Sequence, residues 1–415
     1  MQKTIIPSPI SGVTQAPASK SFTQRAVAAA LLCRGTTTIL KPSHCDDSLA
    51  ALNMARGLGA EVIQGSDEYI LMGGFLLKSQ NLNCGESGLV MRMFAPIAAL
   101  HHKEITFNGK GSLNSRPVSM IGEALRQLGA SFKSSNDLLP FTLCGPMKGG
   151  FAEIDGSVSS QLLTGLLLAL PLAERDSIIK VNDLKSKPYV AMTLQLMDEF
   201  GVEVENRNFE EFFIKGNQQY KACEYRVEGD WSGAAFLLVA GAIAGKIRVE
   251  GLKKDSLQAD RAVLDALRLA GASFEISEYS VEIKRSSLKA FEFDATDCPD
   301  LFPPLAALAA NCNGKSVIKG VSRLIHKESN RALSIGLELM KLGIDIEIKG
   351  DEMLITGGHV KGGDCDSQND HRIAMMLAVL ALNADGLVTI ENAECVNKSF
   401  PAFFEHLKRL GAGIE

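Results

Sequence analysis

The chain has 415 residues, a formal net charge of −5 and nine cysteines. This length allows more than one hydrophobic core, and an acidic balance argues against a broad nucleic-acid-binding surface. The longest apolar runs are too short to span a bilayer, the start at Met1 lacks a long signal-like core, and the cysteines form no Cys-x-x-Cys pair. We therefore expect a cytoplasmic protein with reduced thiols, no metal site and no membrane partner.

One pattern recurs six times along the chain: a helical run ends at a glycine, and two short strands follow. The glycines are 68 to 72 residues apart, at Gly59, Gly129, Gly201, Gly271, Gly343 and Gly411. Glycine ends helices readily because it adopts a left-handed conformation that other residues adopt only at a cost. A fixed period of this length indicates one supersecondary unit used six times.

Each unit also contains a second helix of a different kind. Such runs, at 26–32, 162–170, 236–242 and 373–379, are apolar on all sides, which is typical of buried helices. Three units in each half predict two α/β domains, at 14–225 and at 226–415 together with 1–13. The strand-like segment 4–6 would complete the sixth unit from the other end of the chain.

Basic residues lie at the predicted first turns of helices, where the helix dipole is already positive. Each placement costs a few tenths to about 1 kcal/mol, and a bound anion would compensate for it. The residues concerned are Lys20, Arg116, Lys327, Arg331, Arg372 and Lys398. Ordinary capping accounts for Ser157, Asp230, Asn369, Pro117 and Pro188. The pattern predicts a site for small anions. A ring-shaped DNA clamp is the non-enzyme alternative, but its inner helices would be basic rather than apolar.

Seven short motifs, taken in order, resemble those of the 5-enolpyruvylshikimate-3-phosphate synthase family. They are Ser19-Lys20-Ser21 with Arg25, 157–161, 186–189, Pro299-Asp300, 327–329 with Arg331, 369–372 and 398–401. The resemblance implies an α/β enolpyruvyl transferase fold, with two domains of three βαβαββ units that close on the substrates. It implies transfer of the enolpyruvyl group of phosphoenolpyruvate to the 5-hydroxyl of shikimate 3-phosphate, with release of phosphate. It also implies that the reaction needs no metal or organic cofactor. We further expect a monomer that binds no nucleic acid.

The resemblance also assigns residues to the two substrates. Shikimate 3-phosphate would contact Lys20, Ser21, Arg25, Ser159, Ser160, Gln161, Ser186, Tyr189, Asp300 and Lys327. Phosphoenolpyruvate would contact Lys20, Gly88, Arg116, Gln161, Arg331, Arg372 and Lys398.

The reaction needs a base for the hydroxyl and an acid for the methylene carbon. Asp300 is the expected base, and Glu328 and Lys20 are the candidate acids. The structural alternatives are a helix cap for Asp300 and a first-turn carboxylate for Glu328.

Several positions depart from the family pattern, and these affect substrate affinity more than the reaction. Glu86, Leu89, Arg323 and Asn330 replace more usual residues. Arg92 is interpreted as a structural, paired arginine, because a buried arginine needs a partner. Two rival functions remain. The sister enzyme that acts on UDP-N-acetylglucosamine usually has a loop cysteine that is absent from 109–116, and a phosphate-binding relative without turnover would explain the departures.

Overall fold

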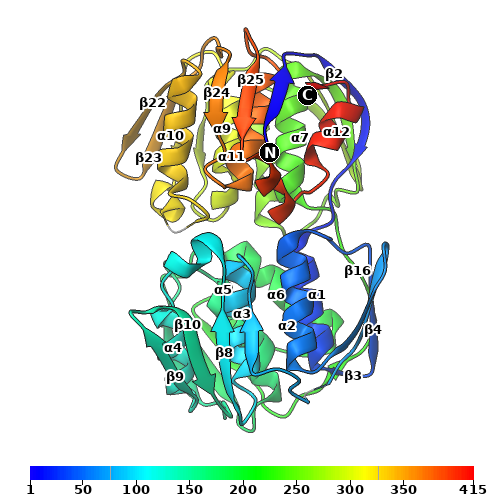
Figure 1. The fold of residues 1–415 in the computed structure, drawn as a ribbon, viewed down its shortest axis with the longest axis vertical. Helices are drawn as coiled ribbons and strands as arrows, with labels where there is room; N and C mark the ends of the chain where they lie inside the picture. Colours follow the sequence, from blue (N-terminus) through cyan, green and yellow to red (C-terminus); the bar gives the residue numbers. More distant parts are fainter. Residues whose placement is uncertain (75, 326) are drawn as a thin grey trace. The chain divides into compact units, whose positions relative to one another are not determined.

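Six four-stranded sheets, each with the same arrangement of strands, form the framework of the protein (Figure 1). The structure is a computed structural model and describes residues 1–74, 76–325 and 327–415. In every one of these sheets a parallel pair of strands is extended on one side by two antiparallel strands. The expected α/β fold of six repeated units is confirmed.

The chain divides into two compact units, Ala18–Val227 and Met1–Pro17 with Glu228–Glu415. The sequence-based proposal places the two crossings at 13/14 and 225/226. The first crossing in the structure follows β2, which ends at Gln15.

The unit Ala18–Val227 contains three of the six repeats. The first comprises α1 (Lys20–Leu32), β4 (Thr36–Leu40), α2 (Asp46–Leu58), β5 (Glu61–Gln64), β6 (Glu68–Met72) and, from later in the chain, β16 (Glu224–Arg226). The second comprises β7 (Asn81–Asn83), α3 (Gly88–Ala98), β8 (Glu104–Asn108), η1 (Gly111–Ser115), α4 (Ser119–Gln127), β9 (Ser131–Ser135) and β10 (Leu138–Cys144). The third comprises β11 (Phe151–Asp155), α5 (Gln161–Ala169), η2 (Leu170–Leu172), β12 (Ser177–Asn182), α6 (Lys187–Glu199), β13 (Glu205–Arg207) and β14 (Glu211–Ile214). A short sheet pairs β3 (Cys33–Arg34) with β15 (Tyr220–Lys221).

The other unit contains the remaining three repeats. The fourth comprises β2 (Ile10–Gln15), α7 (Trp231–Ala244), β17 (Gly245–Glu250), η3 (Ala259–Ala262), α8 (Val263–Leu269), β18 (Ser273–Ile276) and β19 (Ser280–Lys284). The fifth comprises β20 (Glu292–Asp294), η4 (Pro299–Leu301), α9 (Phe302–Ala310), β21 (Lys315–Lys319), η5 (Val321–Leu324), α10 (Arg331–Lys341), β22 (Asp345–Lys349) and β23 (Glu352–Thr356). The sixth comprises β24 (Gly363–Asp366), α11 (His371–Ala381), β25 (Val388–Glu391), η6 (Ala393–Lys398), α12 (Phe403–Arg409), β26 (Gly413–Ile414) and β1 (Lys3–Ile6).

Strand β1 pairs with both β25 and β26, so the expectation that the segment 4–6 completes the sixth unit is confirmed. Its register places Ile5 opposite Val388 on one side and Ile414 on the other. Three of the four-stranded sheets therefore contain a strand that comes from a distant part of the chain, namely β1, β2 and β16.

The six repeat glycines end their helices in the same way. All six have positive φ, from 71° at Gly201 to 127° at Gly59. In each case the amide after the glycine donates back to the carbonyl five residues earlier, as in the 2.9 Å bond from Ala130 to Leu125. This is the Schellman ending, and it turns the chain directly into the next strand.

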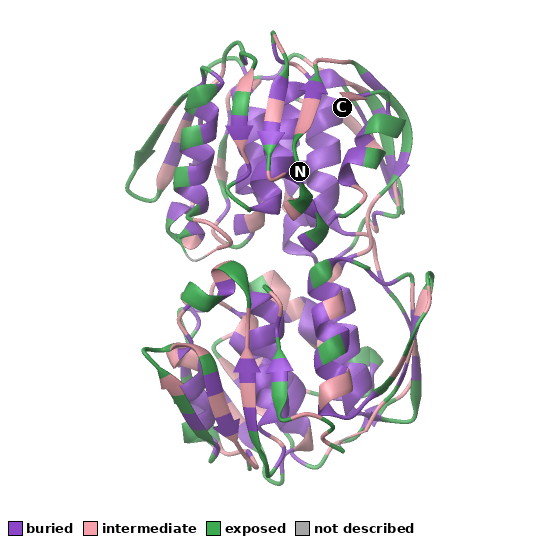
Figure 2. Cartoon of the chain, in the orientation of Figure 1, coloured by how far each residue is buried: buried purple, intermediate pink, exposed green. Residues whose placement is uncertain are grey.

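The two kinds of helix differ in burial as the sequence predicts. Every residue of α3, α7, α9 and α11 is buried, whereas α10 has an exposed side (Figure 2). Helices α7, α9 and α11 contact one another. Helices α3 and α5 also pack closely, because a Cβ at Gly165 would lie 2.6 Å from the carbonyl oxygen of Met93. Within the described part of the chain, no helix is long and apolar enough to cross a membrane.

Candidate active site

Asp300 is the centre of a charged cluster in the unit that contains Glu228–Glu415. Its Oδ1 accepts hydrogen bonds from Arg331 Nη1 at 2.9 Å and Lys327 Nζ at 3.3 Å, and its Oδ2 accepts one from Arg372 Nη2 at 3.1 Å. Arg331 begins α10, Arg372 is the second residue of α11, and Asp300 lies in η4 before α9. The packing of this unit therefore brings three helix starts together.

Arg331 is fully buried and contacts two further carboxylates. Asp370 Oδ2 accepts from Arg331 Nε at 2.9 Å, and Glu328 Oε2 accepts from Arg331 Nη2 at 2.6 Å. Asp370 also accepts from the backbone amide of Arg372 at 3.0 Å, so it caps α11 while it orients Arg331. The guanidinium plane is thus held on three sides.

These contacts set the ionisation of the cluster. Burial would raise the pKa of Asp300, but the charges of Arg372, Lys327 and Arg331 hold it well below its usual value. Burial would lower the pKa of Arg331, but the carboxylates around it raise that pKa further above its usual value. Burial also lowers the pKa of Lys327, and the charge of Asp300 only partly opposes this. Asp300 is therefore ionised, with its oxygens engaged, at neutral pH.

The interpretation that bound anions alone would compensate for the basic helix starts is wrong for this cluster. Three carboxylates of the chain itself already neutralise Lys327, Arg331 and Arg372. A substrate anion would have to compete with them for the two guanidinium groups.

Not every base lies at the first turn of a helix, which corrects a second expectation. Arg116 directly follows η1 and precedes α4 by three residues. Lys327 precedes α10 by four residues, and Lys398 ends η6 ahead of α12. Lys20 does begin α1. Lys398 is buried in an element that packs against α11, the helix that carries Arg372.

A second basic cluster lies at the start of α3 in the unit Ala18–Val227. A Cβ at Gly88 would lie 2.8 Å from Arg116 Nη1 and 3.0 Å from Arg92 Nη1. Arg92 Nη1 donates to Gln161 Oε1 at 2.9 Å, and Ser87 caps the helix by accepting from the amide of residue 90. Three predicted residues, Gly88, Arg116 and Gln161, are thus brought together at the N-terminus of α3, and a helix N-terminus with cationic side chains is the usual setting of an anion site.

Arg92 belongs to this cluster, although the sequence analysis treated it as structural. The predicted pairing exists, because Gln161 is its partner. The spacing of Gly88 and Arg92 could have predicted this position, because residues four apart on a helix share one face.

Lys20 has a carboxylate partner that the sequence analysis did not name. Its Nζ donates to Asp47 Oδ2 at 3.0 Å, and both side chains are largely buried. Asp47 lies in the first turn of α2, where negative charge is favoured. Lys20 therefore has a fixed position at the start of α1, where Ser19 caps the helix.

Arg25 is buried and joins α1 to α6. Its Nε donates to Thr193 Oγ1 at 2.9 Å, and its Nη groups donate to the carbonyl oxygens of Ser21 at 3.0 Å and Tyr189 at 3.3 Å. Burial lowers the pKa of Arg25 to about 10. The structure thus places three predicted residues together, with much of the donor capacity of Arg25 used by the chain itself.

The central serines lie immediately before α5. Ser159 Oγ accepts from the amide of Gln161 at 3.2 Å, and Ser160 occupies the cap position without a side-chain cap bond. Ser186, just before α6, is buried and left-handed with φ 58°. A left-handed serine is strained, and such strain occurs often at functional sites.

Two of the expected caps are wrong. The amide of Ser157 donates to Asp155 Oδ1 at 2.7 Å, so Asp155 is the acceptor in that turn. Asp370, rather than Asn369, caps α11. In the first case α5 begins only at Gln161, too far along the chain for Ser157 to cap it, and in the second Asp370, one position later, accepts from the amide of Arg372.

The positions that depart from the family pattern have ordinary surroundings. The Glu86 side chain packs against Gly111, and Asn330 caps α10 through the amide of Leu333. Arg323 lies in η5 and contributes positive charge near Lys327.

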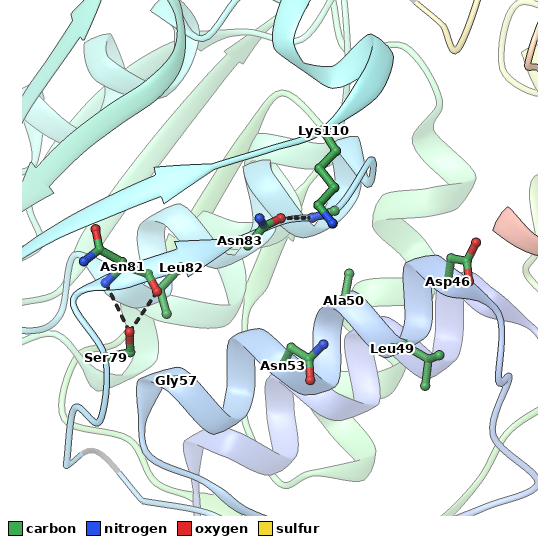
Figure 3. A pocket seen from close by; sticks show the side chains of 11 residues that line it. Asp46, Leu49, Ala50, Asn53, Gly57, Ser79, Asn81, Leu82, Asn83 and Lys110 are labelled. Carbon is green, nitrogen blue, oxygen red and sulfur yellow. Dashed lines mark hydrogen bonds between the residues drawn. The ribbon is translucent and has the colours of Figure 1, made fainter.

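A cavity of about 420 Å³ lies in the unit Ala18–Val227, over α2 and β7 (Figure 3). Its polar lining includes Asn53, Asn81, Asn83 and Lys110. Its lining contains none of the predicted substrate-binding residues, although Gly85 lies just before the α3 cluster.

The repeated units and the clusters of cations at their helix starts define an α/β enolpyruvyl transferase. The solved EPSP synthase of Acinetobacter baumannii matches the chain with a TM-score of 0.85 and 26% identity, over 100% of this chain and 99% of that one. The enolpyruvyl transferase NikO from Streptomyces tendae, 17% identical over 100% of this chain and 98% of that one, has the same fold with a TM-score of 0.82.

The chain belongs to the EPSP synthase family (3-phosphoshikimate 1-carboxyvinyltransferase), whose model matches residues 5–407. The 3-phosphoshikimate 1-carboxyvinyltransferase of Clostridium novyi is 38% identical over 99% of this chain and 98% of its own length. The 3-phosphoshikimate 1-carboxyvinyltransferase of Methanocorpusculum labreanum is 39% identical over 100% of this chain and 99% of its own length. The chain is therefore a transferase of the shikimate pathway, as the resemblance predicts.

Proposed function

We propose that the two clusters perform the reaction of the family, in which the enolpyruvyl group of phosphoenolpyruvate passes to the 5-hydroxyl of shikimate 3-phosphate. The observation that carries this proposal is the arrangement around Asp300. One ionised carboxylate, with Glu328 near it, holds three cations that suit a phosphate and a carboxylate.

Asp300 would accept the proton of the 5-hydroxyl, and Glu328 or Lys20 would protonate the methylene carbon. In the structure the oxygens of Asp300 accept from three cations, which makes the carboxylate a weak base. Anionic substrate groups that bind Arg331 and Arg372 would draw those cations away and raise the pKa of Asp300. Substrate binding would thus prepare the base.

The remaining assignments follow the family. We propose that phosphoenolpyruvate contacts Lys20, Gly88, Arg116, Gln161, Arg331, Arg372 and Lys398. We propose that shikimate 3-phosphate contacts Lys20, Ser21, Arg25, Ser159, Ser160, Gln161, Ser186, Tyr189, Asp300 and Lys327. The contacts of Gly88 with Arg116, and of Arg25 with Ser21 and Tyr189, support grouping these residues.

A phosphate-release assay tests the proposal. We expect release from phosphoenolpyruvate only when shikimate 3-phosphate is the acceptor. Release with UDP-N-acetylglucosamine would favour the sister activity, and binding of both shikimate-pathway substrates without release would favour the non-catalytic relative.

We also propose that the enzyme acts as a monomer in the cytoplasm. The nine cysteines are free thiols, which suits a reducing compartment. Size-exclusion chromatography with light scattering, and fractionation of the source cells, would test the two statements.

A further inference from the structure

Asp260 is a buried carboxylate at the edge of the Asp300 cluster, in η3, and it is only 3% exposed. The Ser232 side chain, in the first turn of the neighbouring α7, lowers the pKa of Asp260 against the larger rise that burial causes. Burying a carboxylate costs free energy unless a cation or a hydrogen-bond donor compensates for it. The groups that compensate for Asp260 are therefore expected among the neighbouring active-site residues.

The Ser232 hydroxyl connects Asp260 to Arg372. Arg372 Nη1 donates to Ser232 Oγ at 2.6 Å. A hydroxyl has a single proton, so a serine oxygen that accepts from Arg372 has its own proton available for a neighbouring carboxylate, and Asp260 is the neighbour whose pKa Ser232 lowers. The three groups form a relay in which the negative charge of Asp260 strengthens the acceptor that holds Arg372.

The backbone around this relay is firmly held. The amide of Trp231 donates to Gln258 Oε1 at 3.1 Å, and Gln258 Nε2 donates to the carbonyl oxygen of Gly229 at 2.8 Å. Asp230 caps α7 by accepting from the amides of Ser232 and the next residue. These bonds fix the first turn of α7 against η3, and so fix the distance between Ser232 and Asp260.

We propose that Asp260 is a positioning residue for Arg372, which it orients through the Ser232 hydroxyl. Arg372 is thereby held with Nη1 on Ser232 and Nη2 on Asp300. This inference rests on the proposed role of Arg372 in binding phosphoenolpyruvate.

The ionisation of Asp260 offers a specific readout. Burial, and then the charge of Asp300, raise its pKa to about 6, while Arg372 opposes the shift. Asp230 also faces it with negative charge, and the thiol of Cys298 lies nearby. Asp260 is therefore charged at pH 8 and largely neutral at pH 5. The relay should weaken as the pH falls through about 6.

The test compares Asp260→Asn, Ser232→Ala and the double variant with the wild type. Each single change should raise the KM for phosphoenolpyruvate roughly tenfold at pH 8, the scale of one charge-assisted hydrogen bond, with the KM for shikimate 3-phosphate changed less than about twofold. The double variant should be no worse than either single one, because both remove the same relay. Asp265→Asn, an exposed change in the neighbouring α8, is the control and should match the wild type.

The pH series separates positioning from a structural role. The ratio of the KM of Asp260→Asn to that of the wild type should fall towards one between pH 8 and pH 5. A ratio that stays constant with pH, or additive effects in the double variant, would overturn the proposal. If Asp260→Asn fails to fold, the test rests on Ser232→Ala: an unchanged KM for phosphoenolpyruvate in that variant would overturn the proposal. Arg372→Ala distinguishes the two proposals, because an unchanged KM for phosphoenolpyruvate there would instead refute the proposed function.

Discussion

Replacing Asp300 with Asn separates the catalytic from the structural role of this carboxylate. The change preserves size but removes the charge that three cations share. Removing one partner of a buried pair costs about 3–5 kcal/mol, but the Asp300 side chain is 23% exposed, so we expect about 2–3 kcal/mol. For a unit of about 200 residues this corresponds to a fall in melting temperature of about 4–12 °C.

In Asp300→Asn the KM for phosphoenolpyruvate and the turnover number should not change together. Without Asp300, Arg331 and Arg372 lose a competing carboxylate, so the KM for phosphoenolpyruvate should stay the same or fall. Turnover should drop about 10² to 10⁴-fold, because the hydroxyl loses its base. Phosphate release measured over both substrate concentrations, together with differential scanning fluorimetry, checks both effects.

The dependence of stability on pH provides an independent check. The pKa of Asp300 is depressed in the folded state, so its contribution to stability is present above the unfolded value near 3.8 and is lost as the pH falls below it. The difference in stability between wild type and Asp300→Asn should therefore disappear only in strong acid. Near-normal turnover, or a large rise in the KM for phosphoenolpyruvate, would refute the assignment of Asp300 as the base.

Three further predictions concern other parts of the molecule. Arg372→Ala should raise the KM for phosphoenolpyruvate far more than that for shikimate 3-phosphate, and equal effects in steady-state kinetics would contradict its assignment. Gly88→Ala would place a Cβ 2.8 Å from Arg116 Nη1, so it should weaken phosphoenolpyruvate binding in calorimetry while α3 stays folded; unchanged binding would move the anion site elsewhere. Gly129→Ala should lower stability by about 1–2 kcal/mol through backbone strain alone, because its φ is 92° and nothing lies within 4 Å of the new Cβ; thermal denaturation that matches the wild type would show that the turn relaxes.

The sequence predicted the repeat because the repeat depends on local chemistry. A glycine with positive φ at Gly129 or Gly343 has the same function wherever its helix lies, so six copies were recognisable without any knowledge of packing. The fully apolar helices were recognisable for the same reason, since a helix without a polar side has to be buried.

The partners of the charged residues were harder to predict because they come from other elements. Asp47 is 27 residues from Lys20, and Asp370 is 39 from Arg331. Ser232, whose hydroxyl accepts from Arg372, is 140 residues from that arginine. Motif spacing identifies the residue type at a helix start, but only the packing of the helices decides which carboxylate faces which cation.

The pairing of strands that are far apart in the sequence determines when each unit can fold during synthesis. The sheets of the unit Ala18–Val227 use only strands from within that range, so this unit can form as soon as β16 has been made. Strand β1 is among the first segments made but has no partner until β25, which ends at Glu391. At about 5–20 residues per second, the nascent chain exposes that strand for roughly 20–80 s. Its short length of four residues limits the unpaired edge that it presents to other chains during that time.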